Sequence, residues 1–173
     1  MPDGVFPLEV VTPEAALLDI AARSVVLRSS DGELTVLDGH TPLVTDIVPG
    51  VLRVETAEGD VLPLAEHGGF LYVDTSPGAA GTEPAADGAP AAGLTTRVTL
   101  LLGVAELAAE IDVDRARRAR DEAQARLVEL ASGSGRGAAD PESPDAANPE
   151  VVEAEAALRR AEVRLEAAGS TGD

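Results

Sequence analysis

Two parts of different fold class are predicted: an antiparallel β-sandwich or barrel over residues 1–103, then two amphipathic helices over residues 104–168. The first prediction rests on short apolar segments with the two-residue period of strands, separated by turn-forming residues. The second rests on a change of period near residue 104, after which apolar residues recur every three or four positions. We therefore expect a strand-rich domain, a helical hairpin or coiled coil, and a short tail over residues 169–173.

Seven short segments of the N-terminal part have the composition and period of strands. Turn-forming pairs separate them, among them Asp38-Gly39 and Pro49-Gly50. Strands this short and this closely spaced favour an antiparallel sandwich or barrel over parallel strands joined by helices. The predicted strands are residues 7–12, 24–28, 33–37, 51–56, 60–65, 69–74 and 96–102.

The C-terminal part has two segments with helical period. Asp112 can cap the first helix, and Asn148 followed by Pro149 forms a good N-cap and first-turn pair for the second. About half of each apolar seam is alanine, whose burial contributes far less than that of leucine, at about 0.8 kcal/mol for each buried CH₂. The hairpin is therefore expected to pack weakly. The seam of the second helix is Val151, Ala154, Leu158, Ala161, Leu165 and Ala168.

Residues 75–94 and 132–149 are rich in Ala, Gly and Pro and interrupt the two parts. Such segments bury too little apolar surface to offset their ordering entropy, so we expect them to be mobile insertions. The second insertion joins the two helices. A loop about four times longer than a tight turn adds on the order of 1.2 kcal/mol of closure entropy, which weakens the hairpin further.

Composition excludes several classes of function. The formal charge is −18 and all thirteen basic residues are arginine, which argues against nucleic acid as a partner. The absence of cysteine excludes a disulfide framework and a thiolate metal site. The N-terminal segment lacks the pattern of a signal peptide, and the longest apolar run, residues 98–105, is too short to span a bilayer. We expect no direct insertion into a membrane.

His40, in the stretch Asp38-Gly39-His40-Thr41-Pro42, has three interpretations: a catalytic base, a structural corner or part of a docking surface. A hydrolase would combine His40 with Asp38 or Asp46. No cysteine, nucleophile motif or second histidine at metal-binding spacing accompanies it, and no Walker-type phosphate loop is present. We therefore expect no catalytic residue and no metal site, which leaves the structural and docking interpretations.

Several segments together resemble one family. They are Gly32-Glu33-Leu34, Asp38 to Leu43, and Pro49-Gly50, followed by residues 64–74 and 98–119. In this order and spacing the chain resembles the epsilon subunit of the F-type proton-translocating ATP synthase, called delta in mitochondria. Asp38 and Thr41 are mild departures from the family's pattern. The resemblance covers the whole chain except the two insertions.

The resemblance implies a sandwich of about ten antiparallel strands followed by an α-helical hairpin, in a non-catalytic rotor subunit of the central stalk. Such a subunit binds gamma and rests on the c-ring, and Glu33, His40, Thr41 and Pro42 would lie in that interface. Its helices lie folded or extend along gamma towards the alpha and beta subunits, where they restrain ATP hydrolysis.

The resemblance also implies a location and an assembly state. The chain would be peripheral, at the cytoplasmic face of the bacterial cell membrane, and would not be a homo-oligomer. The alternative is a free β-sandwich adaptor whose hairpin binds an unrelated partner.

A regulatory ATP site is implied by the same resemblance, although no cofactor is required. The motif residues are Ile111, Asp112, Arg115 and Ala116, with Glu106 five residues before the isoleucine and Arg160 and Arg164 on the second helix. Arginines four positions apart share one helix face and can contact phosphate oxygens. Glu122 replaces a further family arginine, which would weaken ATP binding or favour binding with Mg²⁺. The alternative is that there is no ATP site. In that case Asp112 only caps its helix, and the arginines pair with carboxylates on the same helix.

Overall fold

The computed structural model describes residues 4–77, 94–132 and 148–170. The chain divides into two compact units, Met1–Leu107 and Ala108–Asp173. The boundary lies four residues after the predicted one because Ala105–Leu107 form a short strand, β9, that pairs with residues Leu64–Glu66 of the sandwich. The parts of the predicted insertions at 78–93 and 133–147, and tail residues 171–173, lie outside the described residues.

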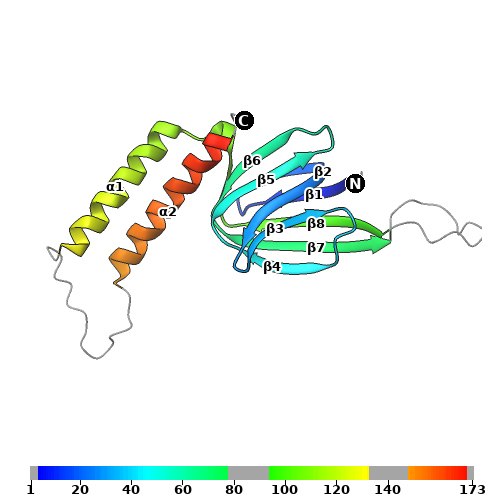
Figure 1. Ribbon diagram of the computed structural model, residues 1–173, viewed down its shortest axis with the longest axis horizontal. Helices are drawn as coiled ribbons and strands as arrows, with labels where there is room; N and C mark the ends of the chain where they lie inside the picture. The colour runs from blue at the N-terminus through cyan, green and yellow to red at the C-terminus, as the bar shows by residue number, and fades with distance from the viewer. Residues whose placement is uncertain (1–3, 78–93, 133–147, 171–173) are drawn as a thin grey trace, which may run out of the picture. The chain divides into compact units, whose positions relative to one another are not determined.

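The first unit is a β-sandwich, as predicted (Figure 1). It has nine strands among the described residues, where about ten were expected. Two strands were missed: β4, whose five residues lie between two prolines, and the three-residue β9. The second strand is also longer than expected. The strands are β1 (Phe6–Val11), β2 (Ala16–Ser29), β3 (Gly32–Leu37), β4 (Leu43–Ile47), β5 (Gly50–Thr56), β6 (Val61–Glu66), β7 (Gly69–Pro77), β8 (Leu94–Leu102) and β9 (Ala105–Leu107).

The 14-residue strand β2 joins the two layers. Its first half pairs with β1, and its second half pairs with β3 and β5. The strand order is β1-β8-β7-β4-β2-β5-β6-β9, with β3 beside β2, and β1 with β8 is a parallel pair. Side chains that alternate inward along these strands form a core of Val and Leu, in which Phe6 is the aromatic member.

The hairpin of β7 and β8 is longer than predicted. It is paired continuously from Gly69 with Leu102 to Pro77 with Leu94. Residues 75–77 and 94, which were assigned to the mobile insertion, are therefore strand residues. The pairing places Thr75 opposite Thr96, beyond the part of β8 that pairs with β1.

The second unit contains the short 3₁₀ turn η1 (Ala108–Glu110) and the two helices α1 (Val113–Ala131) and α2 (Pro149–Gly169), which run antiparallel (Figure 1). Both predicted caps are confirmed. Asp112 Oδ1 accepts the N–H of Arg115 at 2.9 Å, and Asn148 Oδ1 accepts the N–H of Glu150 at 3.0 Å.

The buried side chains of α1 and α2 are small. They are Ala116 and Ala123 on α1, and Ala154, Ala161, Val163 and Ala167 on α2. Val163 and Ala167 lie off the predicted seam, while the predicted seam residues Leu158 and Leu165 are only half-buried. Because alanine buries so little apolar surface, these contacts stabilise the hairpin weakly.

Candidate functional site

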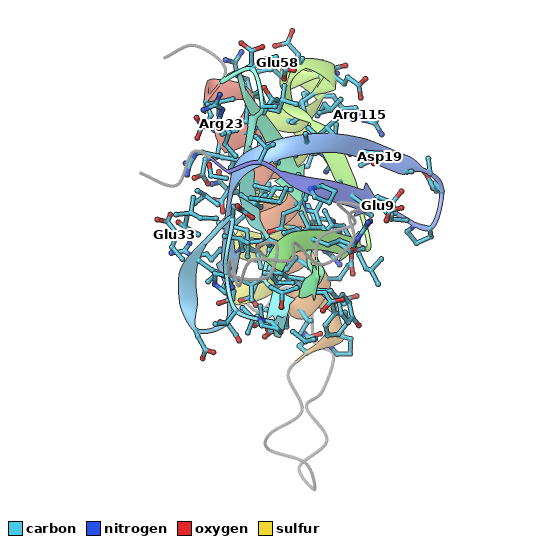
Figure 2. All side chains as sticks on the ribbon, turned by 90° about the vertical axis from the view of Figure 1, so that its right-hand side faces the viewer. Glu9, Asp19, Arg23, Glu33, Glu58 and Arg115 are labelled. Carbon is cyan, nitrogen blue, oxygen red and sulfur yellow. The ribbon has the colours of Figure 1, made fainter. Side chains whose placement is uncertain are left out.

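Strand β3 places the predicted interface residues along one edge of the sandwich. Among the described strands it pairs only with β2. Glu33 is exposed at its start, and His40 follows its end (Figure 2 labels Glu33 on this strand). Between them Thr35 and Leu37 are also exposed. These two residues were missed, although the alternation with the inward-facing Leu34 and Val36 could have identified them.

The corner at residues 38–42 is held by backbone hydrogen bonds. The N–H of His40 donates to the carbonyl of Leu37 at 3.1 Å, and Gly39 between them has a positive φ of 79°. The N–H of Gly39 donates to the buried Thr96 Oγ1 at 2.7 Å. Strand β8 therefore fixes the corner from outside it, through a residue that no motif indicated.

The imidazole of His40 also has a partner in this corner. Its Nδ1 lies 2.7 Å from the carbonyl oxygen of Thr41, which can only accept, so Nδ1 carries the proton. Asp46 is bound elsewhere, because its Oδ1 accepts the hydroxyl of Ser30 at 2.8 Å. The ring nitrogen that a carboxylate would orient, Nδ1, is taken by a backbone carbonyl, which does not support the catalytic interpretation of His40. The described residues also contain no group of three or more His, Asp or Glu side chains arranged to hold a metal.

A second surface, missed from the sequence, lies on the outer face of β4, β7 and β8. Val44, Phe70, Tyr72 and Leu101 are exposed there by 63%, 53%, 40% and 42%. The register pairs Val44 with Tyr72 and Phe70 with Leu101, so these side chains are neighbours on one face. We call these four residues the apolar patch. Two of the chain's three aromatic residues are in it, and contiguous exposed apolar surface of this kind marks interaction sites.

One carboxyl group is buried at the end of the sandwich where β6 turns into β7. Glu66 is 1% exposed, and its Oε2 accepts the N–H of Gly68 at 2.7 Å. Burial raises the pKa of Glu66 from 4.5 to about 7, against the opposing effect of the N–H groups of Gly68 and Gly50. The N–H of Gly50 lowers the pKa of Glu66, but it does not form a hydrogen bond of good geometry with Oε1. Within the described residues Oε1 has no such hydrogen bond.

The predicted ATP-site residues fall in both units. Glu106 is in β9 and therefore belongs to the sandwich, while the other six belong to the helical unit. Around the cap of α1, Ile111 is half-buried, Arg115 is exposed and Ala116 is buried. The role of Asp112 as a helix cap is confirmed by its hydrogen bond to Arg115.

On α2 one predicted arginine already pairs with a carboxylate. Arg160 Nη2 lies 2.9 Å from Glu153 Oε1, and Arg164 is half-buried one turn further on. Glu122 and Glu153 both line a groove of about 630 Å³ between α1 and α2, together with Arg126, Glu150 and a floor of alanines. None of the seven predicted ATP-site residues is among those that line this groove, and carboxylates outnumber arginine in its lining.

Two family models match the chain. One describes the β-sandwich domain of the ATP synthase delta/epsilon chain and matches residues 5–77; the other describes its long α-helix domain and matches residues 109–169.

Neither α1 nor α2, the two long helices among the described residues, is apolar enough over a sufficient length to cross a membrane.

Curated relatives match over nearly the full length. The ATP synthase epsilon chain of Moorella thermoacetica is 36% identical, over 94% of this chain and 96% of its own. That of Desulforapulum autotrophicum is 34% identical, over 95% and 96%. A chain in the cryo-EM structure of the Euglena gracilis mitochondrial ATP synthase has the same fold, with a TM-score of 0.64, 22% identity, and coverage of 95% of this chain and 81% of that one. The chain belongs to the family of ATP synthase epsilon chains, non-catalytic subunits of the ATP synthase complex.

Proposed function

We propose that the chain is a rotor subunit of the central stalk, which couples proton-driven rotation of the c-ring to the gamma subunit. The observation that carries this proposal is the apolar patch, because a subunit of an assembly needs a surface that a partner covers. Phe70 and Tyr72 supply large rigid contact areas, the kind of side chain that dominates interface energies. We assign the apolar patch to gamma.

The exposed edge of β3 is assigned to the c-ring. It presents Glu33 and Thr35 along the strand, then His40, Thr41 and Pro42 at the corner. The corner is rigid because Gly39 and His40 each donate a backbone hydrogen bond. A rigid edge loses little conformational entropy on docking, and polar contacts along it suit the rim of an interface.

The hairpin is proposed to restrain ATP hydrolysis by opening and extending along gamma towards the alpha and beta subunits. Its buried contacts are mainly alanine, and the ion pair from Arg126 Nη2 to Glu150 Oε2, at 3.3 Å, is exposed. Exposed ion pairs contribute about 0–1 kcal/mol. The folded hairpin is therefore held weakly enough for a partner to compete with it.

In the assembled enzyme the chain would be peripheral, at the cytoplasmic face of the bacterial cell membrane.

ATP, with or without Mg²⁺, is proposed as a regulatory ligand that favours the folded hairpin. At ten times its dissociation constant it would stabilise that form by about 1.4 kcal/mol, comparable with the entropy cost of the long connection between the helices. Arg160 and Arg164 would contact phosphate, and Arg160 would have to leave Glu153 to do so.

Co-purification separates the rotor from a free adaptor. The chain, tagged and expressed with the ATP synthase of its own organism, should be recovered from detergent-solubilised membranes with gamma and the c-ring. A Phe70→Ser/Tyr72→Ser variant should lose gamma. The matched control is Val61→Ser, because Val61 is 58% exposed on β6, outside the apolar patch. Recovery of the wild-type chain with neither subunit would favour the adaptor.

A further inference from the structure

Glu66 lies where a charged side chain is costly. Strand β6 points Leu62, Leu64 and Glu66 towards the same side, and Glu66 is 1% exposed at the end of that row. Its backbone is paired with Gly50 on one side and Ala105 on the other. An ionised carboxylate in such a place needs several donors, but Oε2 has one hydrogen bond, from Gly68, and Oε1 has none of good geometry within the described chain.

The charged and titratable groups nearest to this carboxyl are not among the causes of its raised pKa. The Cβ of Arg28, in β2, and the Oε1 of Glu66 both lie beside Gly50. Arg28 itself is exposed. The turn contributes His67, and β9 contributes Glu106 next to Ala105. The raised pKa of Glu66 arises from burial, opposed only by the N–H groups of Gly68 and Gly50.

The same carboxyl holds a pair of turns. Gly68, which donates its N–H to Glu66, accepts the N–H of Gly103 at 3.0 Å through its carbonyl oxygen. The N–H of His67 donates to the carbonyl of Val104 at 3.1 Å. The turn from β6 to β7 is thereby tied to the turn from β8 to β9. Gly68 has a φ of +100°, so this geometry is built for glycine.

We propose that Glu66 is a proton-binding site, and that its protonation state determines whether the two turns at residues 66–69 and 102–105 stay joined or open. When Glu66 is neutral, the buried carboxyl is compatible with its apolar surroundings and the turns stay joined. When it ionises, water must reach the carboxylate, and opening of the turns is the shortest route. The strand that follows, β9, ends the sandwich unit, so it loosens with them. This inference does not depend on the proposed docking function.

The test is amide hydrogen exchange by NMR on the full chain between pH 6 and pH 8, expressed as protection factors for His67, Gly68 and Gly103. If Glu66 titrates near 7 in the closed form and near 4.5 in the open form, the opening equilibrium rises about tenfold over this range. Glu66→Gln, which cannot ionise, should abolish the rise. Glu58→Gln should keep it, because Glu58 is exposed in the turn between β5 and β6 (Figure 2).

A second measurement removes any dependence on how the variant folds. The side-chain carboxyl ¹³C shift of Glu66 in the wild-type chain should titrate near neutral pH, with the amide shifts of Gly68 and Gly103 following the same curve. The proposal is overturned if this carboxyl titrates near 4.5, if the Gly103 amide does not follow it, or if Glu66→Gln keeps the tenfold rise.

Discussion

Thr96 Oγ1 accepts a hydrogen bond from the backbone N–H of Gly39 at 2.7 Å, joining residues 57 positions apart in the chain. Thr96 is fully buried in β8. It lies in the part of β8 that pairs with β7 but not with β1. The bond ties the corner that carries His40 to the strand that follows residues 78–93. The position of the corner therefore depends on a residue far in sequence from the segment Asp38 to Leu43 that forms it.

Thr96→Val should loosen this corner. The substitution keeps the shape of the side chain but leaves the N–H of Gly39 without its acceptor, at a cost of about 1 kcal/mol in the free energy of unfolding. Amide exchange of Gly39 and His40 should accelerate. Thr99→Val is the control, because Thr99 is only half-buried in the same strand. Unchanged exchange at Gly39 would show that Thr96 does not hold the corner.

Replacement of Glu66 should change the pH dependence of stability. The folded-state pKa of about 7 lies above the unfolded value of 4.5, so the folded chain binds more protons between these values. Stability contributed by Glu66 is fully present below pH 4.5 and is lost as pH rises to about 7.

At pH 8 this loss reaches about 3 kcal/mol, from about 1.4 kcal/mol for each unit of pKa. Glu66→Gln should remove that slope from urea unfolding curves measured between pH 5 and pH 8. The same slope in the variant and the wild type would contradict the assignment.

The nucleotide proposal makes a prediction about charge. Glu122→Arg replaces a groove carboxylate with a phosphate-binding side chain and should tighten ATP binding at least tenfold, as measured by calorimetry with and without Mg²⁺. Glu155→Arg makes the same charge change at an exposed α2 position outside the groove. Arg160→Ala/Arg164→Ala should abolish binding. Equal effects of the two glutamate variants would indicate a non-specific effect of net charge.

Alanine packing, not the exposed ion pair, should hold the hairpin. Ala161→Gly removes a buried methyl group at a 1% exposed position, and this loss adds to the helix-propensity cost of about 1 kcal/mol, so the hairpin should lose more than about 1 kcal/mol of stability. Glu150→Gln removes the ion pair with Arg126 and should cost less than about 0.5 kcal/mol. Amide exchange across α1 and α2 reports both changes. The reverse order would show that the ion pair has been underestimated.

The sequence predicted those features that neighbouring residues determine. Asp112 and Asn148 cap their helices because a short polar side chain reaches a backbone N–H two or three positions away. Strands β4 and β9 were missed because strands this short are stabilised by their partners β7 and β6, which lie far away in sequence. The hydrogen bond between Thr96 and Gly39 was out of reach for the same reason.

Side-chain alternation carries more information than residue type at three positions. Aromatic side chains are typical of a core, but Phe70 and Tyr72 alternate with the buried Leu71 and Val73 and face outward. Carboxylates are typical of a surface, but Glu66 continues the inward row of Leu62 and Leu64. At these three positions residue type conflicts with strand period. They form part of the apolar patch, at Phe70 and Tyr72, and a buried acid, at Glu66.

The most direct test of the central claim is the affinity of the purified full-length chain for its own gamma subunit. It is measured by calorimetry for the wild type, Phe70→Ser/Tyr72→Ser and the exposed control Val61→Ser. If the apolar patch is the gamma-binding face, the double variant loses at least a hundredfold in affinity while the control binds as the wild type does. Equal affinity of all three proteins would contradict the assignment.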